Sequence, residues 1–165
     1  MKPTCVVSCP IDTFSGYGTR SRDFVKALIQ SRDKEWDIKI MPQRWGECPW
    51  NALSKDDPLR QRFVGGINND NRPDIWIQIT VPNEFQPSGK KLNIGVTAGI
   101  ETDVFPGEFI AGMNRMDLNL VKQEKEAIGG EEIRGEYVRV GSLGEVSEDG
   151  NWPPFYDKGD KKDNE

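Results

Sequence analysis

Short apolar runs alternate with amphipathic stretches along the first three quarters of the chain. Five runs, most of them rich in β-branched residues, predict strands over residues 4–8, 36–42, 73–82, 91–99 and 117–121. The run from 73 to 82 is the clearest, because Ile75, Ile77 and Ile79 occupy every second position and therefore share one face.

Helical patterns separate these strands. A helix follows the first strand, and either Thr19 or Ser21 can cap it. Its apolar residues form one stripe: Phe24, Val25, Leu28 and Ile29. Shorter helices are predicted over residues 58–63 and 105–116. The alternation through about residue 121 predicts an α/β fold, a single Rossmann-like three-layer domain with a mostly parallel sheet and helices on both faces.

The pattern changes after residue 121, so we divide the chain into a domain over 1–121 and an irregular C-terminal extension over 122–165. Within the extension, residues 122–130 can form a helical turn or two, and residues 136–146 can form one more strand. From residue 147 the chain is Pro, Gly and charge around three aromatic residues: Trp152, Phe155 and Tyr156. Such a composition does not fold alone, so we expect this tail to contact another protein chain.

Composition narrows the function classes. The 165 residues carry a formal net charge of −5, which provides no basic surface for nucleic acid or an anionic membrane. No apolar run approaches the roughly 18 residues of a membrane span, and the N-terminal apolar stretch is too short for a secretory signal. We therefore expect a cytoplasmic protein with no membrane span and no nucleic-acid partner.

The chain has three cysteines and no histidine. An odd number of cysteines argues against a disulfide framework, and a structural zinc site usually takes four Cys or His ligands. Nucleophilic pairs that need histidine are excluded. Acid–base chemistry must therefore come from carboxylates, Lys or Tyr, or from another chain.

The segment "SGYGTRSRDFVKAL", residues 15–28, has two interpretations. Gly16 and Gly18 let a phosphate approach a helix N-terminus, with Arg20 adding charge. Alternatively, the glycines form only a turn before the helix. A dinucleotide site is not favoured, because Ser21 stands where a third glycine is expected and the second strand lacks a terminal acidic residue.

A second candidate lies in "VTAGIETDVFPGEF", residues 96–109. Glu101 and Asp103 follow a central strand, where parallel sheets present ligands, so either carboxylate can orient a sugar hydroxyl or act as a base. Both can equally cap the next helix. Trp45 and Trp50 lie in a long loop, where they can stack on a sugar face or anchor the loop.

Three stretches together resemble the N-terminal domain of GT-B glycosyltransferases of the group 1, family 4-like kind. "SGYGTRSRDFVKAL" resembles the family's "GGYG…SR…L…AL" opening. "LNIGVTAGIETDVFPGEFIAGMNRMDLNLV", residues 92–121, resembles its "IGxTAGIETD…P…W…GxNxMDxxxVPS" stretch. With "PDIWIQITVPNEFQP" between them, the resemblance covers residues 3–121 in the family's order.

The resemblance implies the acceptor-side domain of a nucleotide-sugar-dependent hexosyltransferase. It implies donor-phosphate contacts by Gly16, Tyr17, Gly18 and Arg20, and an acceptor contact by Thr102 beside Glu101. No tightly bound cofactor is implied, and the nucleotide sugar enters as a co-substrate. The family's "VPS" is replaced by "VKQ" and no second, donor-binding Rossmann domain follows, so we expect the chain to be catalytically incomplete by itself.

Three functions remain open on the sequence. The chain is half of a split or degenerate glycosyltransferase whose partner carries the donor domain. Alternatively, it is an inactive structural component of a virion or another large assembly that keeps the fold. The third reading is a stand-alone carbohydrate- or nucleotide-binding module.

Overall fold

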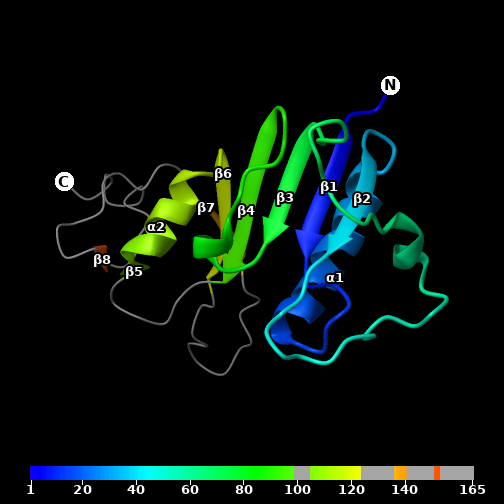
Figure 1. The fold of residues 1–165 in the computed structure, drawn as a ribbon, viewed down its shortest axis with the longest axis horizontal. Helices are drawn as coiled ribbons and strands as arrows, with labels where there is room; N and C mark the ends of the chain where they lie inside the picture. Colours follow the sequence, from blue (N-terminus) through cyan, green and yellow to red (C-terminus); the bar gives the residue numbers. More distant parts are fainter. Residues whose placement is uncertain (99–104, 124–135, 141–150, 153–165) are drawn as a thin grey trace, which may run out of the picture.

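Parallel strands form the centre of the molecule (Figure 1). The computed structural model describes residues 1–98, 105–123, 136–140 and 151–152. Within them, the parallel strands are β1 (Thr4–Cys9), β2 (Asp37–Pro42), β3 (Ile75–Ile79), β4 (Leu92–Ala98) and β6 (Leu118–Gln123). Their order is β2-β1-β3-β4-β6, and β7 (Glu136–Val140) pairs antiparallel with β6 at the edge. The α/β fold class with a mostly parallel sheet is confirmed.

The strand order reverses at β1. The chain moves from β1 to β2 on one side, and then returns to place β3 on the other side of β1. In open α/β sheets, the crevice beyond the carboxyl ends of the strands at such a reversal is the usual ligand site. The topology therefore predicts a ligand site at the carboxyl ends of β1 and β3.

One face of the sheet packs against α1 (Gly16–Arg32). Alternate strand residues such as Val7, Ile40 and Ile77 are buried there with Val25 of the helix. This row stays apolar to the carboxyl ends of the strands, where Cys9 and Ile79 are also buried.

The opposite face packs against α2 (Gly107–Asn114) and the short turn η2 (Pro82–Glu84). Its core contains Val6 and Trp76 from the strands, Phe85, and Ile110 from the helix. Gly112 lets α2 approach η2, because an added Cβ would lie 1.7 Å from the Pro82 carbonyl oxygen. Helices on both faces, as predicted, give three layers.

Further elements complete the described chain. The short helix η1 (Pro58–Arg62) begins at the predicted proline. β5 (Phe105–Pro106) precedes α2 and pairs with β8 (Asn151–Trp152) in the C-terminal extension. No helix in the described ranges combines the length and apolar character needed to cross a bilayer.

One expected helix start is wrong. Ser15, rather than Thr19 or Ser21, caps α1, because the Ser15 hydroxyl accepts a hydrogen bond from the Gly18 amide at 2.9 Å. Ser21 is buried inside the helix and donates to the Tyr17 carbonyl. The glycine segment is therefore the first helical turn.

Within the extension, one predicted element changes and the described part of another is found. β6 continues through Gln123, into the stretch predicted as a helical turn, and residues 124–130 lie outside the described residues. Residues 136–140 of the predicted last strand form β7. Trp152 lies in β8, whereas Phe155 and Tyr156 lie outside the described residues.

Candidate functional site

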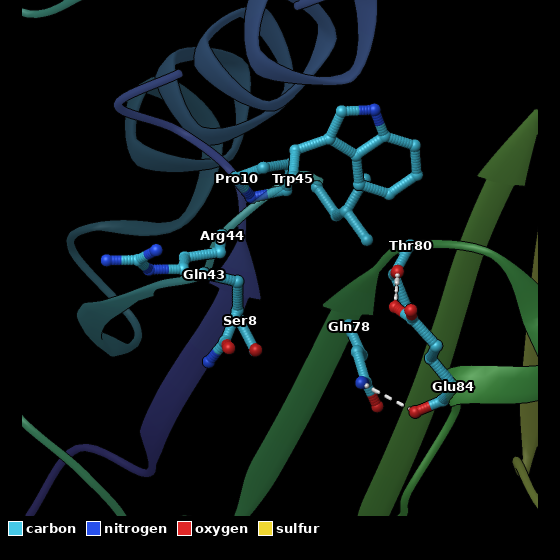
Figure 2. Close-up of a pocket in the computed structure, with 9 residues that line it drawn as sticks. Ser8, Pro10, Gln43, Arg44, Trp45, Gln78, Thr80 and Glu84 are labelled. Carbon is cyan, nitrogen blue, oxygen red and sulfur yellow. Dashed lines mark hydrogen bonds between the residues drawn. The ribbon is translucent and has the colours of Figure 1, made fainter. Parts of the chain in front are cut away.

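A pocket of about 60 Å³ opens beyond the carboxyl ends of β1, β2 and β3, at the reversal of strand order. That volume holds roughly four or five water molecules. The polar and aromatic residues that line it are Ser8, Gln43, Arg44, Trp45, Gln78, Thr80 and Glu84. Figure 2 shows Ser8 and Gln43 on one side of the space, with Gln78, Thr80 and Glu84 on the other.

Strand register brings two of these side chains together. Val6 pairs with Trp76, and two residues later Ser8 pairs with Gln78. Because side chains alternate between faces, both pairs lie on the α2 face. The same row thus begins as core and ends in polar groups at the pocket.

The β1 side of the pocket offers hydrogen-bonding groups that have no described protein partner. Ser8 is 1% exposed, and its hydroxyl has no hydrogen-bond partner among the described residues. The side-chain amide of Gln43 has none in the same part of the chain, although its backbone N–H donates to the Cys9 carbonyl at 2.9 Å. Both groups border the pocket, where water or a ligand can hydrogen-bond to them, whereas among the described residues the buried side-chain atom without a partner is Asn119 Oδ1.

The β3 side is already organised. The Gln78 side-chain amide donates to the Glu84 carbonyl at 3.0 Å and accepts from the Gln86 N–H at 2.9 Å. The Thr80 hydroxyl donates to Oε2 of Glu84. The other carboxylate oxygen of Glu84 has no partner within the described residues, and it is available to a ligand.

Two aromatic rings stack beside the pocket. Tyr17, in the first turn of α1, lies over Trp45 with ring centroids 4.1 Å apart and an angle of 21° between the planes. The Tyr17 hydroxyl lies 3.2 Å from the Thr97 hydroxyl and accepts from the Ala98 N–H at 3.2 Å. The pair therefore connects α1, the loop after β2 and the carboxyl end of β4.

The two glycines of the first turn have different surroundings. A Cβ at Gly18 would lie 2.2 Å from the Thr13 carbonyl oxygen, so packing against the preceding loop requires glycine there. A Cβ at Gly16 would meet nothing within 4 Å. Packing within the described chain thus accounts for Gly18 and leaves Gly16 unexplained.

The other predicted site residues do not contribute to the described pocket lining. Glu101, Thr102 and Asp103 lie outside the described residues. Arg20 lies in the second turn of α1 and is not part of the pocket lining. Trp50 is also absent from the lining, and the Arg44 guanidinium lies 5.9 Å from its ring. The structure therefore brings together Tyr17 and Trp45 from the predicted set.

Most of the pocket residues were not predicted from the sequence: Ser8, Gln43, Gln78, Thr80 and Glu84. A signal for some of them was present. In "IWIQIT" the isoleucines fill one face, while Trp76, Gln78 and Thr80 on the other face change from apolar to polar toward the carboxyl end. Such a change within one row is typical of a strand that ends in a site.

Two of the cysteines, Cys5 and Cys9, are buried. Burial raises the pKa of Cys5 and of Cys9 to about 12, so both thiols are protonated and poorly nucleophilic near neutral pH. Among the described residues, no group of three or more His, Cys, Asp and Glu side chains is arranged to hold a metal ion.

Comparisons of the chain with protein-family models, with curated proteins and with solved structures find no match.

Proposed function

We propose that the pocket binds the edge of a sugar ring and that the chain supplies the acceptor side of a glycosyl transfer. In this proposal it is the GT-B N-terminal-like half of a split or degenerate nucleotide-sugar-dependent hexosyltransferase. The observation that carries the proposal is the pocket lining, which combines hydroxyl, amide and carboxylate groups with an indole at the reversal of strand order.

The chemistry of these groups suits a polyol. Vicinal hydroxyls both donate and accept hydrogen bonds, which matches the Ser8 hydroxyl and the Gln43 amide that border the pocket opposite the β3 side. Trp45 adds an apolar surface for the C–H groups of a ring. The pocket volume accepts one edge of a hexose, while the rest of the ring stays in the open mouth.

The donor side of the proposal rests on the family resemblance. A donor phosphate would approach the first turn of α1, where the open space at Gly16 admits it and where Tyr17, Gly18 and Arg20 are the resembling positions. Glu101 or Asp103 would serve as the acceptor base, with Thr102 beside the acceptor. The partner is a second, cytoplasmic chain that carries the nucleotide-sugar domain.

Ligand binding tests the pocket directly. Saturation-transfer NMR of the full chain with methyl glycosides of glucose, galactose and mannose should detect binding to at least one of them. Gln43→Ala should weaken that binding about fivefold, because its amide has no other described partner. Gln61→Ala, an exposed glutamine in η1, is the matched control and should bind normally.

Two results would contradict the proposal. One is the absence of binding to every glycoside by folded protein, and the other is equal binding by the Gln43→Ala and Gln61→Ala variants. Native purification then tests the partner. A co-purifying chain with nucleotide-sugar-dependent transfer supports the split enzyme, whereas a complex of structural proteins without transfer favours the assembly component.

A further inference from the structure

The charge of the pocket restricts the class of ligand further than its hydrogen-bonding groups do. Among the charged groups that line it, Glu84 contributes a carboxylate with one uncommitted oxygen. Arg44 also lies at the edge, but Figure 2 shows its guanidinium extending away from the space between Ser8 and Gln78. That guanidinium lies over the ring of Trp50.

Neighbouring cations are also directed elsewhere. Arg115, beside η2, donates to the carbonyls of Phe85 and Asn83 at 2.8 and 3.1 Å, and it is not part of the pocket lining. The other lining groups with hydrogen-bonding side chains, Ser8, Gln43, Gln78 and Thr80, are uncharged. The described pocket thus presents one negative charge to its ligand and no lysine or arginine head group facing it.

Hydrogen bonds hold Glu84 in a position where its carboxylate can contact a substituent of the bound sugar. The Thr80 hydroxyl fixes one carboxylate oxygen, and the Gln78 amide fixes the Glu84 backbone. The free oxygen accepts a hydrogen bond from a hydroxyl or an ammonium group, whereas a ligand carboxylate or phosphate there would meet like charge without a compensating cation.

Resting on the proposed function, we infer that Glu84 makes this pocket selective for saccharides that carry a neutral or ammonium substituent at the bound edge. Uronic acids and sugar phosphates bind more weakly. An unacetylated amino sugar is the preferred class, because its ammonium group pairs with the carboxylate and its remaining hydroxyls can hydrogen-bond to Ser8 and Gln43 across the pocket.

Charge-matched ligands test this selectivity. The full chain is titrated with the methyl glycosides of glucose, glucosamine and glucuronic acid at about pH 6, where the amine is protonated and the carboxylate ionised. We expect glucosaminide to bind about fivefold tighter than glucoside and glucuronide about fivefold more weakly, the size of an ion pair near a protein surface. Added salt should reduce both differences.

Two variants isolate the residue. Glu84→Gln keeps an oxygen for the Thr80 hydroxyl and should make the three affinities nearly equal. Asp56→Asn removes the same charge from an exposed loop residue outside the pocket and should leave the selectivity intact.

The outcomes separate this inference from the proposed function. If no glycoside binds, the saccharide site itself fails and the inference falls with it. If all three bind equally, the saccharide site stands and charge selection is overturned. If selection persists unchanged in Glu84→Gln, a group other than Glu84 is responsible, and the inference is overturned at that residue.

Discussion

The two faces of the central sheet use the same strands for different purposes. On the α1 face, Val7 and Cys9 of β1 and Ile77 and Ile79 of β3 are all buried and apolar. On the α2 face, the row from Val6 and Trp76 ends in Ser8 and Gln78. The two rows come from the same strands, β1 and β3, and their residues alternate along each strand. Only the row on the α1 face remains apolar up to the carboxyl ends of these strands.

The difference shows how a site is built on a sheet without weakening it. Because strand residues alternate between faces, a polar residue at every second position leaves the opposite row unbroken. The α1 row supplies burial to the edge of the sheet, and the α2 row is therefore free to place a hydroxyl and an amide there. We expect substitutions on the two faces to have different effects.

The largest expected effect comes from the apolar row. Ile77→Ala should lower the free energy of unfolding by about 2–5 kcal/mol, because it removes buried methyl groups and leaves a cavity against α1. Denaturant unfolding followed by circular dichroism measures the change. Lys26→Ala on the exposed side of α1 is the control, and a comparable loss in both variants would refute the role assigned to this row.

Substitutions of the two glycines in the first turn of α1 should have the next largest effect, and the effect should differ between them. Gly18→Ala should cost about 1–3 kcal/mol, because the new Cβ would lie 2.2 Å from a backbone oxygen that cannot move cheaply. Gly16→Ala meets open space and should leave stability unchanged or raise it by about 0.5 kcal/mol. Thermal unfolding of both variants checks this, and equal destabilisation would show that the two glycines are not distinguished by packing.

Ser8→Ala tests the row of residues on the α2 face, which ends in polar side chains. Removing a hydroxyl that borders the pocket and has no described protein partner should leave stability nearly unchanged. Binding of the saccharide ligand should weaken in the same variant. A marked loss of stability would instead assign the hydroxyl a structural role, and the comparison of the two faces would lose its main support.

Thiol reactivity gives the smallest change, because it leaves the fold unaltered. Cys5 and Cys9 face α1, and burial raises the pKa of each thiol from 9.0 to about 12. At about pH 8, a disulfide reagent should therefore modify half-buried Cys48 quickly and the other two only after unfolding. Cys48→Ser should lose the fast phase, and fast reaction of a second thiol would contradict the burial.

The same two pKa values have a consequence at alkaline pH. Since the folded values lie above the unfolded ones, the stability that protonated thiols contribute is fully present below about pH 9. It is lost as the pH rises toward about 12. Alkaline unfolding measured with Cys5→Ala should show a smaller loss over that range.

The fold could be predicted from the sequence because its signals are local. The isoleucine alternation of β3, the β-branched run of β1 and the stripe of α1 each identify an element without knowledge of its neighbours. The cap of α1 was mispredicted, because Ser15 precedes two glycines that are poor helix formers, so the helix appeared to start later.

The site was harder to predict, because its residues meet only through register and topology. Ser8 and Gln78 are 70 positions apart in sequence and become neighbours through the pairing of β1 with β3. Glu84 reaches the pocket through η2, a turn that depends on its packing against Gly112 of α2. Tyr17 and Trp45 were singled out individually, but their stacking could not be read from sequence spacing.

That aromatic pair also constrains how the chain can diverge. Tyr17, Trp45 and Thr97 come from three separate segments, and each depends on another for a ring contact or a hydroxyl contact. A substitution at one of these positions leaves the others with an exposed ring or with a hydroxyl that has lost its partner. Among chains descended from a common ancestor with this one, the three positions should therefore change together, as a linked set inherited whole.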